Sequence, residues 1–410
     1  MLDGLRVLDA SRVMSGPYAS MLLGDYGAKI IKVEDTGTGD ETRQWYPPTI
    51  DGESAYYLST NRNKKDIALN LKTPEGLKIF YELAKRSDVL IENFRPGVTT
   101  KLRIDYNSIS KINSKIVYCS ISGFGQTGPY AKLPGYDLIV FAMGGIMSFT
   151  GEANRPPVRV SVPIADMCAG LYSVTAILAA LRYLDRTGKG QSIDISMYDV
   201  QVSLLTHQAM AYFATGENPN KLGSSHANLA PYQAFMGNDG EFFVLAVGND
   251  NLWDDLCTAL GKPEMSEDPR FKTNPDRMKN KQVLIAILAE IFSHKPAKYW
   301  MELSQKAGVP AAPISLVSQV LSDQHTLARE MVVSIDNSRT GKKLKQLGTA
   351  AKFSAAKTSI TLPPPAQGQD TIEILRDLGY TNKQIQNLTR NNVVKIYTAN
   401  PKVRNQSIAN

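Results

Sequence analysis

The sequence has few cysteines and histidines, and none of them has the spacing of a metal ligand. Its three cysteines, Cys119, Cys168 and Cys257, lie far apart and form no CxxC pair, which argues against a disulfide framework and a thiolate metal site. The four histidines form no HExxH or similar pattern, so we expect each to be a surface or satisfied polar residue. These absences predict a protein of a reducing compartment, the cytoplasm, without a bound metal.

Long apolar runs and an export signal are also missing from the pattern. A membrane span needs about 18 to 20 consecutive apolar residues. The best candidates, residues 138–147 and 171–181, are short and contain small or polar residues. The N-terminus has no basic segment followed by an apolar core. We therefore expect no membrane partner.

The charge balance of the chain is positive but has no compact basic block. The formal net charge is +7, and the lysines and arginines are spread over the whole sequence. The densest cluster, Lys342, Lys343 and Lys345, follows Thr340-Gly341 and is typical of a solvated hairpin turn. We predict no nucleic-acid partner, and a phosphate-rich small molecule explains the positive charge more simply.

The length of 410 residues and the 43% of apolar residues are enough for two domains. The first 200 residues alternate β-rich runs with amphipathic helical ones, which is the pattern of a parallel sheet with crossover helices. The expected strands are residues 6–9, 29–34, 88–94, 116–122 and 192–197; the expected helices begin near Pro17 and cover 73–86, 166–184 and 199–215. The predicted fold class is α/β, with a Rossmann-like large domain that lacks the GxGxxG turn of a dinucleotide site.

Composition also predicts the domain boundaries. We expect a large domain over residues 1–215, a linker over 216–231, a small α/β domain over 232–315, a return linker with the C-terminal part of the large domain over 316–390, and a loose tail over 391–410. The small domain should contain a strand at 242–248 and helices at 250–260, 279–294 and 298–308, and another helix is expected at 370–378.

A series of short motifs runs through the chain in a fixed order. They are Leu2-Asp3-Gly4 with Val7-Leu8-Asp9, Gly16-Pro17, Leu23-Gly24-Asp25-Tyr26-Gly27-Ala28, Ile31-Lys32-Val33-Glu34, 61–65, 71–76, 89–97, Gly123-Phe124-Gly125 with Gly128-Pro129-Tyr130, and 187–191. Through them, residues 2 to about 388 resemble the class III CoA-transferases, the family of formyl-CoA transferase, carnitine CoA-transferase and α-methylacyl-CoA racemase. The resemblance implies two interlocked rings, and therefore an intertwined homodimer.

Asp166 stands at the start of the predicted helix 166–184. From the residues alone, it is an aspartate stabilised by the positive end of a helix dipole. The resemblance implies that it is the catalytic nucleophile, whose carboxylate attacks an acyl-CoA thioester and forms a mixed anhydride and then an aspartyl-CoA thioester. A carboxylate suits this role because it is already ionised at neutral pH and needs no general base.

The resemblance also places a coenzyme A site. CoA or acyl-CoA would be a substrate, and no prosthetic group is implied. The residues that match the family's CoA contacts are Val13, Met14, Leu69, Asn70, Leu71, Lys72, Asn93, Phe94, Arg95, Lys101, Lys132 and Met197. From the residues alone, Val13, Met14 and Met197 fit core packing equally well, and Lys101 and Lys132 fit a solvated surface.

Two departures from the family pattern affect the expected site. Asp35 and Lys101 stand where some members have arginine, and Arg43 is a candidate to supply the missing cation. The segment 223–232 contains Ser224-Ser225-His226 in place of the glycine-rich loop of formyl-CoA transferase. The oxalate and formate specificity of that branch is therefore not expected here.

Two further functions compete with CoA transfer. An α-methylacyl-CoA racemase has the same fold but needs a base and an acid on opposite faces of the α-carbon, and its branch has a histidine where this chain has Tyr136. A phenol with a pKa of about 10 is a poor base at neutral pH. A CoA-binding protein without catalysis is disfavoured because Asp166 and its flanking residues are intact.

Overall fold

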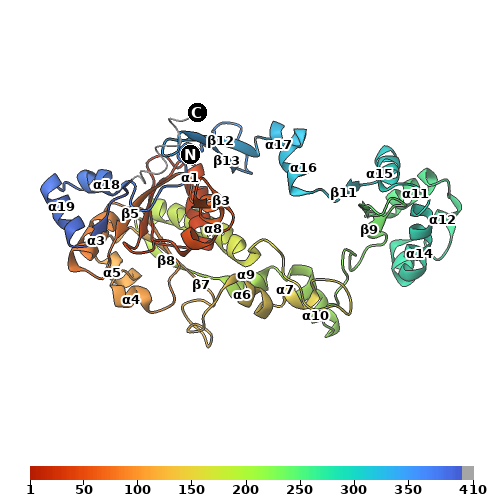
Figure 1. Cartoon of the computed structure of the whole chain (residues 1–410). Coiled ribbons are helices and arrows are strands. Elements are labelled where there is room, and N and C mark those ends of the chain that lie inside the picture. Colours follow the sequence, from red (N-terminus) through yellow and green to blue (C-terminus); the bar gives the residue numbers. More distant parts are fainter. Residues whose placement is uncertain (399–410) are drawn as a thin grey trace. The chain divides into compact units, whose positions relative to one another are not determined.

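The computed structural model describes residues 1–398, and they form two compact units (Figure 1). The first unit contains residues 1–146, 159–209 and 324–398. The second contains 147–158 and 210–323. Residues 147–158 and 210–215, which we expected in the large domain, thus group with the second unit. The first unit is discontinuous in sequence, because the chain leaves it and returns to it.

A twisted sheet forms the centre of the first unit and confirms the predicted α/β fold. Its strand order over the described residues is β14-β5-β2-β1-β6-β7-β8. The strands are β1 (Arg6–Asp9), β2 (Lys29–Glu34), β5 (Lys64–Leu69), β6 (Val89–Glu92), β7 (Val117–Ser122), β8 (Gln191–Ser196) and β14 (Val394–Lys395). All neighbours pair in parallel except β14, which is antiparallel to β5. The order reverses between β1 and β6, where open α/β sheets bind ligands at the carboxyl ends of their strands.

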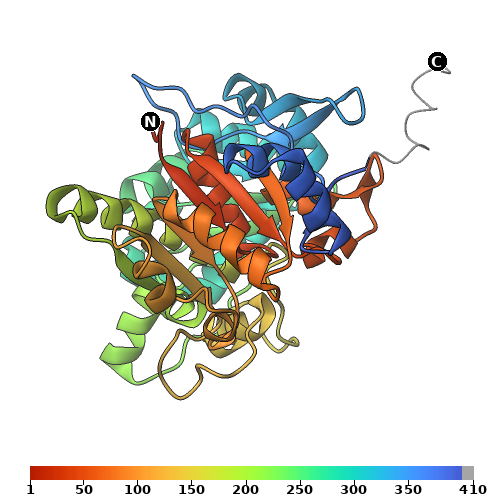
Figure 2. The ribbon, with the colours of Figure 1, turned by 90° about the vertical axis from the view of Figure 1, so that its left-hand side faces the viewer.

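The two faces of the sheet bury alternate residues, as the two-residue period of a strand requires. Val7 packs into a cluster with helices α1 (Ser15–Asp25) and α8 (Ile164–Thr187). Leu8 packs into a second cluster with α3 (Pro74–Lys85), α18 (Thr371–Asp377) and α19 (Asn382–Arg390). Figure 2 shows the dark blue helices α18 and α19 beside the red and orange N-terminal part of the chain. The C-terminal segment therefore completes a layer that the N-terminal half begins.

The remaining elements of the first unit are short. They are η1 (Glu41–Gln44), β3 (Thr49–Ile50), β4 (Glu53–Ser54), α2 (Ala55–Thr60), α4 (Val98–Leu102), α5 (Tyr106–Ser110), α6 (Asp137–Met143), α9 (Met197–Ser203), α17 (Gln324–Ala328), β12 (Val332–Asn337) and β13 (Lys342–Leu347); α7 (Ile146–Phe149) and α10 (Thr206–Thr215) cross the boundary between the units. Strands β12 and β13 form the hairpin that we predicted around Thr340-Gly341.

Strand β14 differs from the loose tail that we predicted over residues 391–410. Val394 is buried and pairs with Leu69, and the Asn70 backbone N–H donates to the Val393 carbonyl at 2.8 Å. Residues 399–410 lie outside the described part of the chain. This strand could not be predicted from the sequence, because only two residues pair and their partners lie more than 300 positions away.

Helix α8 is longer and more apolar than the sequence led us to expect. By length and composition it could cross a membrane, with a mean hydropathy of 1.7 in an 18-residue window. We had treated the polar residues of 171–181 as interruptions. The Ser173 hydroxyl instead donates to the Ala169 carbonyl at 2.7 Å, and the Thr175 hydroxyl to the Leu171 carbonyl at 3.0 Å, so both are satisfied inside the helix. A core helix passes the same test of length and composition, and 39% of the window is buried.

The second unit is a small antiparallel sheet with helices around an aromatic core. Its elements are β9 (Tyr232–Met236), β10 (Phe242–Ala246), β11 (Ala311–Pro313), α11 (Asp250–Ala259), α12 (Glu264–Glu267), α13 (Asn274–Lys279), α14 (Lys281–Phe292), α15 (Ala297–Lys306) and α16 (Val317–Ser322). The strand order is β11-β10-β9. The expected strand 242–248 and the helices near 250–260, 279–294 and 298–308 are all present. The core includes Trp253, Phe271, Phe292 and Trp300.

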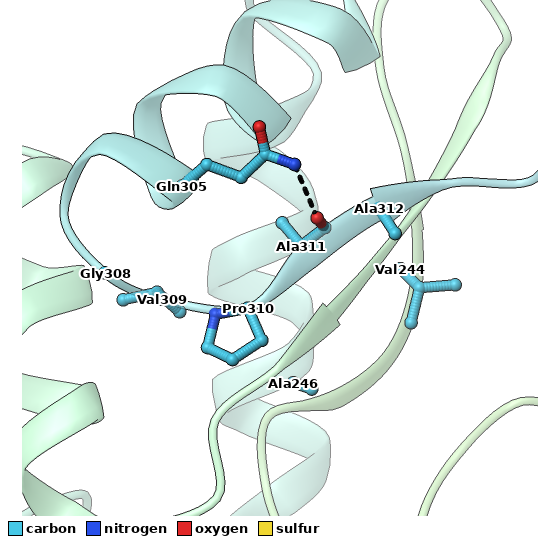
Figure 3. Close-up of a pocket in the computed structure, with 8 residues that line it drawn as sticks. All are labelled: Val244, Ala246, Gln305, Gly308, Val309, Pro310, Ala311 and Ala312. Carbon is cyan, nitrogen blue, oxygen red and sulfur yellow. Dashed lines mark hydrogen bonds between the residues drawn. The ribbon is translucent and has the colours of Figure 1, made fainter. Parts of the chain in front are cut away.

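A pocket of about 360 Å³ opens between the end of α15 and strands β10 and β11 (Figure 3). Its lining is formed mainly by small or apolar residues, including Val244, Ala246 and Pro310. The polar side chain of Gln305 donates to the Ala311 carbonyl at 2.8 Å and is therefore already paired. The pocket offers an apolar surface, but its lining supplies no reactive group.

Candidate active site

Asp166 lies in the first turn of α8, and a second carboxylate caps the same helix end. The Asp137 side chain, from the start of α6, accepts hydrogen bonds from the backbone N–H of Ala165 at 2.9 Å and of Asp166 at 3.4 Å. The first N–H groups of a helix have no partner within it, so a capping carboxylate from another element fixes the helix end. Asp137 therefore sets the direction in which α8 presents Asp166.

The N-terminus of α1 also faces Asp166. The hydroxyl and the backbone N–H of Ser15 lie close enough to the Asp166 carboxylate to lower its pKa. The two helices approach closely, because a side chain added at Gly170 would meet the Ser15 carbonyl at 2.8 Å. Gly16 is needed for a similar reason, since an added carbon would lie 2.3 Å from the side chain of Ser11. The Asp166 carboxylate thus lies between the N-termini of two helices.

This environment raises the pKa of Asp166 to about 7. Burial is the main cause, and repulsion from the Asp137 carboxylate adds to it, whereas the polar groups of Ser15 lower the pKa. Burial also raises the pKa of Asp137. We expected a nucleophile that is fully ionised at neutral pH, and the structure corrects this. In the free protein near pH 7, Asp166 is a mixture of carboxylate and acid.

A pH dependence follows from this pKa. If Asp166 is the nucleophile that the family resemblance implies, only its carboxylate form can attack, so kcat/KM for an acyl-CoA should rise with pH through a midpoint near 7 and then level off. Asp137→Asn removes the like charge but keeps an oxygen that can accept the capping hydrogen bonds. The pKa of Asp166 should fall, and the midpoint should move to lower pH. A pH–rate series on both proteins tests this, and an unchanged midpoint in the variant would contradict it.

Tyr56, from α2, is a further polar group beside the two carboxylates. Burial raises the pKa of Tyr56 to about 12, and the charges of Asp166 and Asp137 contribute. Its hydroxyl therefore keeps its proton at neutral pH and can donate a hydrogen bond. The ring packs edge-on against Trp45 at 5.0 Å between centroids.

One cation belongs to the same group of charges. The Arg159 guanidinium lowers the pKa of both Asp137 and Tyr56, against the larger effect of burial. Arg159 is exposed, and in the part of the chain that the structure describes it forms no hydrogen bond or ion pair. It is therefore available to an anionic ligand.

A cavity of about 610 Å³ lies at the carboxyl ends of β1, β2, β5 and β6, beside the point where the strand order reverses. Five of the predicted CoA contacts line it: Leu69, Asn70, Leu71, Lys72 and Phe94. The rest of the lining includes residues 10–12 and much of the segment 33–40. Lys72 is exposed, and its ammonium group has no ion pair or hydrogen bond among the described residues.

Five more predicted residues lie next to this lining. Val13 and Met14 follow Arg12 in the β1–α1 loop, and Arg95 follows Phe94. Asn93 holds the same loop: its side chain accepts from the Arg12 N–H at 2.9 Å and donates to the Arg12 carbonyl at 2.6 Å. Lys101 is exposed on α4, whose residues Val98 and Leu102 line the cavity.

The last two predicted residues lie away from the cavity lining. Lys132 is an exposed loop residue. Met197 is buried in the core cluster that contains α1 and α8, and it begins α9 instead of ending β8. Met197 therefore lies where the alternative interpretation, plain core packing, would place it.

Arg43 does not compensate for Asp35. Its guanidinium donates to both oxygens of Glu34 at 2.9 and 2.7 Å, and also to the Tyr57 hydroxyl and the Pro365 carbonyl. Asp35 lines the cavity. Of the lining cations, Arg12 pairs with Glu41 at 2.9 Å, which leaves Lys72 as the available amine in the described lining.

Sequence reasoning missed four polar residues of the site: Ser15, Tyr56, Asp137 and Arg159. Ser15 precedes the Gly16-Pro17 motif, and Asp137 follows Tyr136, so the motifs lay beside them without indicating their roles. Tyr56 gave no signal, because its proximity to Asp166 arises only in the folded chain. No group of three or more histidine, cysteine, aspartate and glutamate side chains able to hold a metal occurs within residues 1–398.

Comparison with known proteins agrees with this arrangement. The family model described as CoA-transferase family III matches residues 2–371. The human succinyl-CoA:glutarate CoA-transferase is 41% identical over 394 residues, covering 96% of this chain and 90% of that protein. The acetyl-CoA:oxalate CoA-transferase of Acetobacter aceti is 43% identical over 332 residues, covering 81% and 85%.

Solved structures give the same result. A CAIB/BAIF family protein from Brucella suis superposes with a TM-score of 0.82 at 40% identity, covering 92% of this chain and 99% of that chain. Its match extends over both units described above. The chain is therefore an enzyme that belongs to CoA-transferase family III.

Proposed function

We propose that this enzyme moves CoA from an acyl-CoA thioester to a carboxylic acid through covalent intermediates on Asp166. The observation that carries the proposal is the position of the Asp166 carboxylate between two helix N-termini, with Ser15 beside it. Backbone N–H groups at such ends can stabilise the negative charge that develops when a carboxylate attacks a thioester.

The proposed reaction has four steps and consumes no proton. The Asp166 carboxylate attacks the thioester carbonyl, the carbon–sulfur bond breaks, and CoA leaves as a thiolate from a mixed anhydride. The thiolate attacks the aspartyl carbonyl and releases the first acid, which leaves an aspartyl-CoA thioester. The acceptor carboxylate attacks the aspartyl carbonyl of this thioester, which releases the CoA thiolate and forms a second mixed anhydride. The thiolate then attacks the acceptor's carbonyl in that anhydride, which gives the new acyl-CoA and frees the Asp166 carboxylate. Each intermediate keeps the activation that hydrolysis would destroy.

We place the phosphates and adenosine of CoA in the cavity of the first unit. Lys72 and Lys101 are exposed amines on or beside its lining, and a 3′-phosphate and pyrophosphate need fixed positive charge. Asp35 lies on the same lining, and its negative charge would repel a phosphate. The proposal therefore gives Lys72 the main phosphate contact.

We propose a dicarboxylic acid as one of the two exchanged acids. Relatives at 41% and 39% identity are named succinyl-CoA:glutarate CoA-transferase and succinate–glutarate CoA-transferase. Such a substrate keeps a free carboxylate while the other one reacts, and Asp166 and Asp137 would repel it. Arg159 is the cation of this charge cluster that could bind it.

An exchange assay tests the proposed function. Acyl-CoA donors are paired with glutarate, succinate and other acids, and the CoA esters are read by mass spectrometry, with hydroxylamine added to trap an aspartyl hydroxamate at Asp166. A 2-methylacyl-CoA is incubated in deuterated water as the test of racemisation. Tyr136, which stands in place of the racemase histidine, is 54% exposed at the N-cap of α6. Rapid α-deuterium incorporation without CoA exchange would contradict the proposal.

We further propose that two copies form the intertwined homodimer, in the cytoplasm and without membrane insertion. In one chain, the apolar or aromatic side chains of Leu171, Tyr172, Leu178 and Tyr183 are exposed along α8. Such a patch needs a cover of protein or lipid. Because the opposite side of α8 packs on α1 and the sheet, a second copy suits it better than a bilayer. Mass photometry at nanomolar concentration should find dimers. Reversible dissociation into monomers would refute the intertwined arrangement of the two chains.

A further inference from the structure

The β1–α1 loop contains a backbone conformation that its residue type disfavours. Val13 has φ +70°, in the left-handed region. A β-branched side chain is seldom found there, because its Cβ substituents crowd the adjacent peptide groups, and such strain persists only when surrounding contacts impose it. Strained residues of this kind are concentrated at functional sites, and Val13 lies two positions before Ser15. The question is therefore what holds Val13 in place.

The contact that holds Val13 comes from a buried carboxylate. The Val13 N–H donates to both oxygens of Asp40, at 3.2 and 3.3 Å. Lys32 pairs with Asp40 at 3.0 Å, and both side chains are completely buried. The Lys32 ammonium also donates to the Ser11 carbonyl at 2.9 Å. One buried ion pair therefore binds the loop at Ser11 and at Val13.

Asp40 is itself held rigidly. Its backbone N–H donates to Glu34 at 2.8 Å, and its side chain accepts from the Thr42 N–H at 3.0 Å and the Thr42 hydroxyl at 2.8 Å. Buried ion pairs are seldom retained for stability alone, since the cost of desolvating two charges is large. A role in fixing one conformation is a physical reason to keep this one.

The loop that Lys32 and Asp40 hold leads directly into the catalytic end of α1. The Tyr18 N–H closes the first turn on the Met14 carbonyl at 2.8 Å. Ser15 lies in this turn, beside Asp166 and against Gly170 of α8. A change of φ at Val13 rotates the peptide groups that follow it. The geometry of Val13 therefore decides whether Ser15 can face Asp166.

We propose that the buried Lys32–Asp40 pair is a positioning device: it holds Val13 at positive φ, so that the N-terminus of α1 with Ser15 stays beside Asp166. The inference rests on the proposed function, because it assumes that Asp166 is the nucleophile whose surroundings Asp40 helps to position. Asp40 is a positioning residue in this scheme and does not itself contact the substrate.

A double-mutant cycle tests the device. Glycine adopts positive φ without strain, so Val13→Gly should make the loop independent of Asp40. We expect Asp40→Asn to lower kcat at least tenfold in the native background but less than threefold in the Val13→Gly background. Val13→Ala is the matched control, because alanine loses the branched side chain but still disfavours positive φ, and it should give no such rescue. An equal loss in all three backgrounds would overturn the proposal, as would no loss in any.

Two further measurements separate this role from a general structural one. Ser15 lowers the pKa of Asp166, so if Asp40→Asn turns Ser15 away, the midpoint of the pH–rate profile should move to higher pH, and Val13→Gly should restore it. The same cycle is read from the thermal unfolding midpoint, which needs no activity. If wild type transfers no CoA, the proposed function fails, and the unfolding cycle still decides the role of Asp40. If Asp40→Asn does not fold, recovery of folded protein by Val13→Gly and not by Val13→Ala supports the proposal; failure in both overturns it.

Discussion

Asp166→Asn should lower the rate of CoA transfer about 10³-fold or more, which corresponds to about 4 kcal/mol of lost transition-state stabilisation. An amide has nearly the same shape as the carboxyl group, but it is not a nucleophile and cannot form the anhydride. The capping of α8 depends on Asp137, not on the side chain of Asp166, so the fold should remain. Transfer is measured by mass spectrometry of the CoA esters, and CoA binding by calorimetry should change little.

The same helix supplies a matched control. Asp185 is exposed near the other end of α8, and Asp185→Asn should leave transfer unchanged. The hydroxamate trapped by hydroxylamine should appear in the peptide that contains Asp166 in wild type and in the control, and be missing in Asp166→Asn. Transfer by Asp166→Asn at a tenth of the wild-type rate or more would refute the covalent role.

The fold was predictable where local pattern and burial agree. Strands β1, β2, β6, β7 and β8 are continuous apolar or alternating runs bounded by helices, and such patterns reflect contacts that each strand makes on both sides. Strand β5 was missed because its sequence, Lys64-Lys65-Asp66-Ile67-Ala68-Leu69, begins with charged residues. Lys64 and Asp66 are nevertheless buried. Lys64 can be buried because it pairs with Asp9 at 3.1 Å. Buried ion pairs cannot be recognised from one partner, so the polar half of this strand resembled a loop.

The site was predictable only in part, for a related reason. Asp166 and the residues 69–72 are positions that the family resemblance identifies. The groups that shift the pKa of Asp166 come from two other elements: Ser15 from α1 and Asp137 from α6. Each of these residues has an ordinary local role, and only the packing of α8 against both α1 and α6 brings them to Asp166. The raised pKa of Asp166 is therefore a property of the tertiary structure, and no local pattern could indicate it.

A second large effect is expected from a buried ion pair outside the catalytic chemistry. Arg62 donates to both oxygens of Asp25, at 3.0 and 2.6 Å, and both side chains are almost fully buried. Asn63 donates to the same carboxylate at 2.8 Å. Asp25 ends α1, and the backbone N–H of Ser359 donates to its carbonyl at 3.0 Å. This pair therefore joins α1 to the segment before β5 and to the returning C-terminal chain.

Arg62→Met should lower the free energy of unfolding of the first unit by about 3 to 5 kcal/mol, because it leaves the Asp25 carboxylate buried without its cation. Arg62→Met combined with Asp25→Leu should recover much of the loss, since a buried pair replaced by apolar residues costs little. Lys65→Met is the control: Lys65 pairs with Glu373 where both side chains are about half exposed, and such pairs contribute at most about 1 kcal/mol. Urea unfolding, followed by circular dichroism and by hydrogen exchange of the first unit, gives the three values. A loss for Arg62→Met no larger than that for Lys65→Met would show that Asn63 and the Thr349 hydroxyl satisfy the Asp25 carboxylate without Arg62.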